Sequence, residues 1–309
     1  MATIAFLGNR ESPKFNLKLW SRMTPGRSGV WGNLTGIDDP LIADYVVALD
    51  SYDLSVPHDW IHNYSPVQLA TLVDVEKLIL LGAHPESNCY YTNMDLEPDN
   101  CCRRIDIGKT MGFGEWWIKH DYDYLSALQP VEKTKKLGAI VSDANTTDYH
   151  AKRLAWLERF CQKHLKKLDI YGTINATDVM YPNYKGVCGQ RGVDAEGYMT
   201  GKAATYEKYE CMIEFDANGD HYFSERVYDC LLMYCFMFYW GGGGVKKYFP
   251  QGCHFLFDID GEGDDVLAEM ARPDFYAKKL PAIKEARDML LNRYQLWPRI
   301  HRELYGTCK

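Results

Sequence analysis

Short apolar runs separated by polar turns recur along the chain, and this pattern predicts alternating strands and helices. Several runs are almost continuously hydrophobic, which is typical of strands that helices cover on both faces of a parallel sheet. The strands expected from these runs are 3–8, 44–50, 77–83, 136–143, 167–172, 209–216, 236–240 and 254–260. Apolar residues at helical spacing predict helices over 66–75, 148–166 and 224–235. The alternation predicts an α/β fold.

The clearest unit is a strand, a helix and a second strand over residues 136–172. The strand pattern restarts there after an aromatic and charged stretch, which places a domain boundary near residue 130. A length of 309 residues suits two domains of ordinary size. The expected organisation is a first domain over 1–130, a second domain over 131–280 and C-terminal helices over 281–309 that cross back onto the first domain. Those last helices are expected to break or kink at Pro298.

Composition narrows the class of protein. Hydrophobic residues make up 46% and charged residues 25% of the chain, as in soluble globular proteins, and no apolar stretch is long enough to predict a membrane span. The N-terminus lacks the basic region of a secretory signal, so a cytoplasmic protein is expected. The ten cysteines are scattered through apolar segments, and most of them are expected to be reduced and buried. The net charge of −7 argues against nucleic acid as a partner.

The segment SERVYDCLLMYCFMFYWGGGGVKKYF, residues 224–249, carries the clearest candidate chemistry. Ser224 is placed to cap a helix, and helix N-termini at the carboxyl ends of parallel strands favour phosphate. Gly241–Gly244 follow the strand 236–240 at the same edge, where glycine lets backbone amides approach a ligand closely. The alternative is a flexible turn between buried elements.

This segment resembles the donor-binding motif of α1,3-fucosyltransferases, glycosyltransferase family 10, and the resemblance covers residues 133–260. The residues in matching places are Tyr209, Phe215, Tyr222, Glu225, Tyr239, Gly241 and Phe249. Two motifs depart from the family pattern: Asp216-Ala217-Asn218 replaces Glu-Asn-Ser, and Ser224-Glu225-Arg226 replaces Thr-Glu-Lys. Asp216 in place of glutamate and Arg226 in place of lysine keep the charges, but the aspartate is shorter and the guanidinium differs in geometry from an ammonium group.

The resemblance implies a GT-B-like fold, in which two Rossmann-like domains face each other across a cleft. It makes 1–130 the acceptor-binding domain and 131–280 the domain that binds the donor, a nucleotide sugar. It implies an inverting transfer to a glycan acceptor, with GDP-fucose as the first candidate donor. UDP-xylose and GDP-mannose are alternative donors, and a non-catalytic protein that binds sugar nucleotides or carbohydrates is an alternative function. The resemblance implies no obligatory metal, although Asp258-Ile259-Asp260 resembles a metal-binding Asp-x-Asp motif of the other large glycosyltransferase fold. We expect the acidic side chains of this loop to lie on the protein surface. The alternative is that they bind a divalent ion.

The resemblance and the local chemistry together give the candidate site residues. Donor binding is assigned to Arg191, Lys202, Asp216, Asn218, Tyr222, Ser224, Glu225, Arg226, Gly241, Gly242 and Lys246. Arg191 and Arg226 are preferred for the diphosphate because a guanidinium contacts phosphate oxygens in pairs. Lys246 and its neighbour Lys247 are equally well explained as surface cations.

The catalytic base is expected after the strand 77–83 of the first domain. Glu86 and His84 both follow this strand, and either side chain accepts a proton if its pKa lies near neutrality. Glu86 is slightly favoured, whereas alignment of the neighbouring proline favours His84. Glu11, after the first strand, is a reserve candidate.

Overall fold

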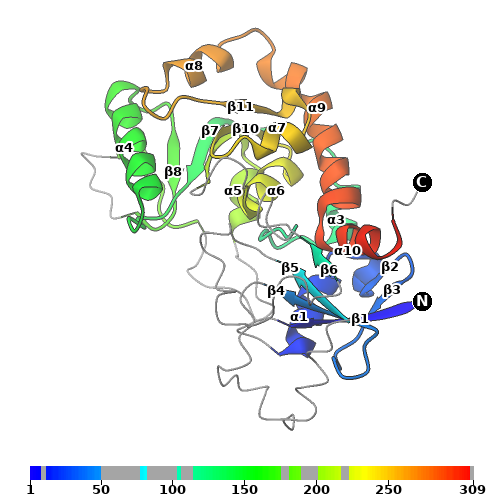
Figure 1. The fold of residues 1–309 in the computed structure, drawn as a ribbon. Coiled ribbons are helices and arrows are strands. Elements are labelled where there is room, and N and C mark those ends of the chain that lie inside the picture. The colour runs from blue at the N-terminus through cyan, green and yellow to red at the C-terminus, as the bar shows by residue number, and fades with distance from the viewer. Residues whose placement is uncertain are drawn as a thin grey trace. The chain divides into compact units, whose positions relative to one another are not determined.

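The computed structural model describes residues 1–7, 12–49, 77–81, 103–105, 114–174, 181–188, 201–216 and 223–306. The chain forms two compact units (Figure 1). Unit 1 contains Met1–Glu115, Asp121–Ala127 and Leu291–Lys309, and unit 2 contains Trp116–His120 and Leu128–Leu290. The functional domain limits of 1–130, 131–280 and 281–309 stay a prediction.

Unit 1 is built on a six-stranded sheet with the order β2-β3-β1-β4-β5-β6. Its strands are β1 (Ala2–Leu7), β2 (Val30–Trp31), β3 (Leu34–Gly36), β4 (Tyr45–Leu49), β5 (Leu78–Leu81) and β6 (Arg103–Ile105). All neighbouring pairs are parallel except the short β2–β3 hairpin. Its helices are α1 (Pro13–Ser21), a 3-10 turn (Pro25–Arg27), α3 (Tyr122–Ala127) and α10 (Leu296–Tyr305).

Aromatic packing joins the two ends of the chain within unit 1. The ring of Phe6 on β1 lies 5.1 Å from that of Trp20 on α1 and 5.3 Å from that of Trp297 on α10. All three side chains are buried. Because such pairs stabilise a core beyond their buried area, they fix α1 and α10 against the same strand.

Unit 2 is built on a five-stranded sheet with the order β11-β10-β9-β7-β8, in which every neighbouring pair is parallel. Its strands are β7 (Lys135–Ile140), β8 (Asp169–Tyr171), β9 (Tyr209–Phe215), β10 (Phe236–Trp240) and β11 (His254–Leu256). Its helices are α4 (Asp148–Lys163), α5 (Lys202–Tyr206), α6 (Glu225–Leu232), α7 (Gly244–Tyr248), a 3-10 turn (Gln251–Cys253), α8 (Asp264–Met270) and α9 (Phe275–Met289). Because β8 and β9 lie on opposite sides of β7, the strand order reverses between β7 and β9, and such a point is where open α/β sheets bind ligands.

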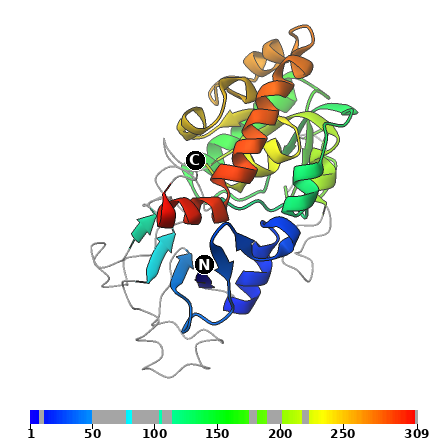
Figure 2. The same cartoon turned by 90° about the vertical axis from the view of Figure 1, so that its right-hand side faces the viewer.

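Helices cover both faces of the unit 2 sheet (Figures 1 and 2). Successive side chains of a strand point to opposite faces, so Phe215 and Glu214 of β9 mark the two sides. On one face, the ring of Trp156 on α4 packs against that of Phe215, with the ring centroids 5.7 Å apart. On the other face, the phenol of Tyr206 on α5 donates a hydrogen bond to Glu214 at 2.8 Å. The near-continuous apolar strands of the sequence are explained by this double covering.

The α/β fold class with two mainly parallel sheets is confirmed, and the two α/β units agree with the predicted GT-B-like class. The predicted helix over 66–75 lies outside the described residues. The C-terminal helices break close to Pro298, as predicted, but the break precedes the proline: helix α9 continues into a π-helical turn (Leu290–Tyr294), and α10 begins anew after Gln295. Pro298 therefore lies in the first turn of α10, where its missing N–H needs no acceptor. No helix in the described part of the chain is long and apolar enough to cross a membrane.

Candidate functional site

The candidate site lies at the carboxyl edge of the unit 2 sheet. Because its strands are parallel, Ile140, Phe215 and Trp240 end β7, β9 and β10 at one edge. The predicted donor-binding residues Asp216, Ser224 and Gly241 follow these strand ends or cap the next helix. The structure thus brings them together, although they are up to 25 positions apart in the chain.

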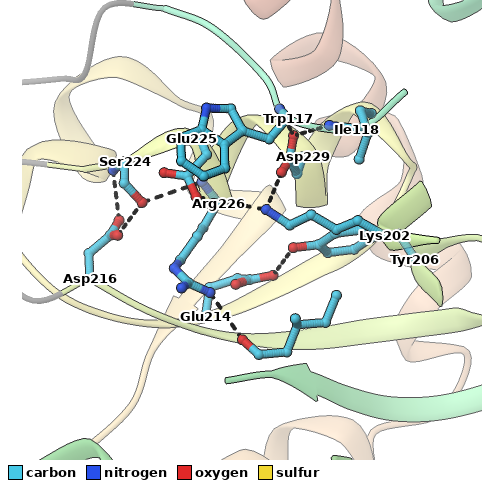
Figure 3. A network of polar contacts seen from close by, with 11 residues as sticks. Trp117, Ile118, Lys202, Tyr206, Glu214, Asp216, Ser224, Glu225, Arg226 and Asp229 are labelled. Carbon is cyan, nitrogen blue, oxygen red and sulfur yellow. Dashed lines mark hydrogen bonds and ion pairs between the residues drawn. The ribbon is translucent and has the colours of Figure 1, made fainter. Parts of the chain in front are cut away.

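Asp216 braces the start of α6. One of its carboxylate oxygens accepts hydrogen bonds from the backbone N–H of Ser224 at 2.9 Å and from the phenol of Tyr239 at 3.0 Å. The other oxygen accepts one from the Ser224 hydroxyl, and Ser224 in turn caps α6 by accepting from the N–H of Arg226 at 3.3 Å (Figure 3). Both carboxylate oxygens of Asp216 are therefore engaged within the protein, which fixes the direction of the helix that carries Arg226.

Gly241 leaves room for the phenol of Tyr239, which donates a hydrogen bond to Asp216. A Cβ atom at position 241 would lie 2.6 Å from Cζ of Tyr239, the residue whose phenol holds Asp216. Glycine is thus required here by the protein's own packing, whatever ligand approaches.

The rest of the glycine run is only partly a loop, because Gly242 is buried and Gly244 already belongs to α7. Lys246 lies exposed on α7, as the interpretation as a surface cation expects.

Lys202 belongs to a buried ion-pair network. Its ammonium pairs with Asp229 and lies 3.7 Å from a carboxylate oxygen of Glu225. Burial alone lowers the pKa of Lys202, but these two carboxylates raise it above its ordinary value. Asp229 also accepts hydrogen bonds from the backbone N–H groups of Trp117 at 2.7 Å and Ile118 at 3.2 Å (Figure 3). The network holds α5, α6 and the segment 116–120 together, so the positive charge of Lys202 is already compensated inside the protein.

Arg226 has spare hydrogen-bonding capacity. Its Nη1 donates to the carbonyl oxygen of Ile140, the last residue of β7, at 3.0 Å. Burial lowers the pKa of Arg226, but Glu225, Glu214 and Asp216 raise it above its ordinary value. None of these three carboxyl groups, nor any other among the described residues, forms an ion pair with its guanidinium. Arg226 therefore presents a positive charge where the strand order reverses.

Glu214 on β9 is a buried carboxyl group beside this arginine. One oxygen accepts the hydrogen bond from Tyr206, and the other has no hydrogen-bond partner within the described part of the chain. Burial raises the pKa of Glu214 to about 8, although Arg226 and Lys202 act to lower it. Its side chain is therefore largely protonated at neutral pH.

Arg153 of α4 is a second arginine at this edge, and the sequence interpretation missed it. Its Nη2 donates to the carbonyl oxygens of Ser142 at 2.9 Å and Ala144 at 3.1 Å, just beyond β7. The residue is 4% exposed, and its Nε has no hydrogen-bond partner among the described residues. The sequence contained one signal of its burial. Arg153 lies four residues before Leu157, and residues four apart share a helix face, so this arginine falls on the apolar stripe.

Several predicted residues lie outside the described part of the chain. These are the candidate bases Glu86, His84 and Glu11 and the donor-binding candidates Arg191, Asn218 and Tyr222. Nothing in the structure bears on them, so their roles stay predictions.

The acidic loop after β11 is paired within the protein. Asp258 accepts a hydrogen bond from the N–H of Asp260 at 3.0 Å, and Lys163 pairs with Glu262 at 2.5 Å and Asp264 at 2.7 Å. Within the described ranges, no group of three or more His, Cys, Asp or Glu side chains is placed to hold a metal ion. The Lys163 pairs agree with a surface role for this loop.

Comparison with protein-family models and with curated proteins gives no match for this sequence. Among solved structures, an α1,3-fucosyltransferase is similar with 11% identity and a TM-score of 0.46, over 96% of this chain and 91% of that one. An α1,3-fucosyltransferase with GDP-fucose is similar with 12% identity and a TM-score of 0.42, over 96% and 92% of the two chains. T4 phage BGT in complex with its UDP-glucose substrate is similar with 11% identity and a TM-score of 0.48, over 99% and 100%. These are similarities of fold.

Proposed function

We propose that this protein is an inverting glycosyltransferase of the GT-B type, which transfers a sugar from a nucleotide sugar to a hydroxyl group of a glycan acceptor. The observation that carries the proposal is the position of Arg226. It projects from the first turn of α6, spans the switch point to the end of β7, and makes no ion pair with a described carboxylate.

This position suits the diphosphate of a sugar nucleotide. Open α/β sheets bind nucleotides at the switch point, and the N-terminus of a helix favours negative charge. A guanidinium adds paired donors that match phosphate oxygens. The bracing of Ser224 by Asp216 and Tyr239 keeps the arginine and the helix start in a fixed geometry. Such fixed donors stabilise charge without reorganisation when that charge develops.

The proposed reaction is a single displacement. The acceptor hydroxyl oxygen forms a bond to the anomeric carbon while the bond from that carbon to the diphosphate oxygen breaks, with inversion. The hydroxyl proton passes to a base, for which Glu86 is the first candidate and His84 the second. Arg226, together with the predicted Arg191, neutralises the departing diphosphate, so this proposal requires no metal ion.

The donor is proposed from the sequence resemblance over residues 133–260, which favours GDP-fucose over UDP-xylose or GDP-mannose. Thermal unfolding of the full chain with GDP, UDP and their sugar derivatives tests this, because a ligand that binds the native state raises the Tm. We expect a shift with one nucleotide series, and release of the free nucleotide when a glycan acceptor is added. Binding without release would favour the non-catalytic alternative, and no shift with any nucleotide at millimolar concentration would contradict the proposal.

A further inference from the structure

Two arginines from two helices converge on one strand end. Arg226 of α6 donates to the carbonyl oxygen of Ile140, and Arg153 of α4 donates to those of Ser142 and Ala144. Their acceptors therefore lie within five consecutive residues, 140–144, at the carboxyl end of β7. Helix α4 follows β7 in the chain and α6 follows β9, so the arginines approach the switch point from its two sides.

The charges around the two arginines differ. Three carboxyl groups, those of Glu225, Glu214 and Asp216, raise the pKa of Arg226, whereas no carboxyl group is among the groups that shift the pKa of Arg153. Burial, followed by the positive charge of Arg226, lowers the pKa of Arg153 to about 10. A buried charge of this kind is ordinarily paired, because an uncompensated charge is costly to remove from water. An anion bound between the guanidinium groups would supply the missing charge.

The hydrogen-bond donors that Arg153 does not use within the described residues are consistent with a bound anion. Both of its hydrogen bonds come from Nη2, while its buried Nε has no partner among the described residues. Two backbone carbonyls fix the plane of the guanidinium and leave its remaining N–H groups for another acceptor. A phosphate group offers several acceptor oxygens and matches the paired donors of a guanidinium.

We propose that Arg153 and Arg226 form one anion site at the carboxyl end of β7, and that Arg153 binds a phosphate of the nucleoside diphosphate. This inference rests on the proposed function for the identity of the anion. The competing explanation is that Arg153 only holds the turn 142–144 in place.

Helix α4 offers a matched control for the test. Arg159 also donates to two backbone carbonyls, those of Ile259 at 2.6 Å and Gly261 at 3.3 Å, but these belong to the loop after β11. Arg153→Gln and Arg159→Gln each remove a guanidinium that caps a turn, and only the first removes one from the proposed site. Arg153→Lys keeps the charge and loses the paired donors.

The experiment is isothermal titration calorimetry of the full chain and these variants, with inorganic pyrophosphate, GDP and UDP as probes. We expect Arg153→Gln to weaken the binding of pyrophosphate, and of the nucleoside diphosphate that binds, by about tenfold to a hundredfold. Arg159→Gln should bind as the unmodified protein does. Equal affinities for the two Gln variants would overturn the inference.

Further outcomes separate this inference from the proposed function. If a nucleoside diphosphate binds in a way that depends on Arg226 but not on Arg153, the inference fails and the function survives. If pyrophosphate binds through Arg153 while neither nucleotide binds, the anion site stands and the function fails. Should Arg153→Gln not fold, Arg153→Lys decides: severalfold weaker binding of pyrophosphate supports the site, and unchanged binding overturns it.

Discussion

Arg226 donates a hydrogen bond from Nη1 to the carbonyl oxygen of Ile140 at 3.0 Å, and this bond ties the first turn of α6 to the end of β7. The two residues are 86 positions apart in the chain. The contact spans the point where the strand order of unit 2 reverses, so it places a fixed positive charge where open α/β sheets bind their ligands.

Replacing this arginine should affect ligand binding strongly. We expect Arg226→Gln to weaken binding of the preferred nucleoside diphosphate by about tenfold to a hundredfold, because a charge-assisted hydrogen bond to phosphate is lost. Calorimetric titration of the full chain measures the change, with Arg159→Gln as the control. Wild-type affinity in Arg226→Gln would show that the diphosphate does not contact this side chain.

Glu214 should make stability depend on pH. Its folded-state pKa of about 8 lies above the ordinary value of 4.5, so between these values the folded protein keeps a proton that the unfolded chain releases. The free energy of unfolding therefore falls as pH rises from about 5 to 8, by at most about 1.4 kcal/mol per pH unit for this one group. Glu214→Gln keeps the shape and removes the titration, so its stability relative to the unmodified protein should increase over this range.

Urea unfolding at several pH values measures this difference. The control is Glu210→Gln on the same strand, where the carboxylate forms a solvent-exposed pair with Lys136 at 2.6 Å. That variant removes a carboxylate from the same strand and leaves Glu214 in place. A pH dependence that Glu214→Gln leaves unchanged would refute the assignment.

The buried pair of Lys202 and Asp229 should show strong coupling. Lys202→Met leaves the carboxylate of Asp229 buried without its cation, which costs about 3–5 kcal/mol of stability. Adding Asp229→Asn removes that charge and keeps an oxygen for the N–H groups of Trp117 and Ile118, so the double variant should be more stable than Lys202→Met alone. A double-mutant cycle in chemical denaturant measures the coupling, and purely additive effects would rule it out.

Gly241→Ala should disturb the brace at α6. The new Cβ would lie 2.6 Å from Cζ and 2.9 Å from Cε1 of Tyr239, so the phenol must move away from Asp216. We expect a loss of about 1–3 kcal/mol in stability, as for other overpacked cores, together with weaker nucleotide binding. Gly261→Ala is the control, because its Cβ would meet nothing nearer than 3.4 Å. Equal stabilities of the two variants would contradict this role for Gly241.

The fold followed from the sequence where apolar runs were long and continuous. The strand 236–240 has the predicted limits, because every side chain in it is apolar and the glycine run 241–244 follows it directly. The β2–β3 hairpin and β6 were not predicted, since Val30–Trp31, Leu34–Gly36 and Arg103–Ile105 do not lie in long apolar runs.

The site was harder to predict for physical reasons. A sequence displays the charge of Lys202 but not its pairing with Asp229, which lies 27 positions away and meets it only in the folded unit. Arg153 interrupts an apolar stripe, and its importance depends on the carbonyls of Ser142 and Ala144 that the turn after β7 brings to it. Gly241 was singled out as a donor-binding residue, which stays a prediction, and the packing constraint that the structure shows comes from the phenol of Tyr239.

A crystal structure of the full chain with bound GDP or UDP tests the central claim most directly. We predict that the phosphates lie at the carboxyl end of β7, with at least one phosphate oxygen hydrogen-bonded to the guanidinium of Arg226. Phosphates bound elsewhere on the protein, with Arg226 making no contact to them, would contradict the account.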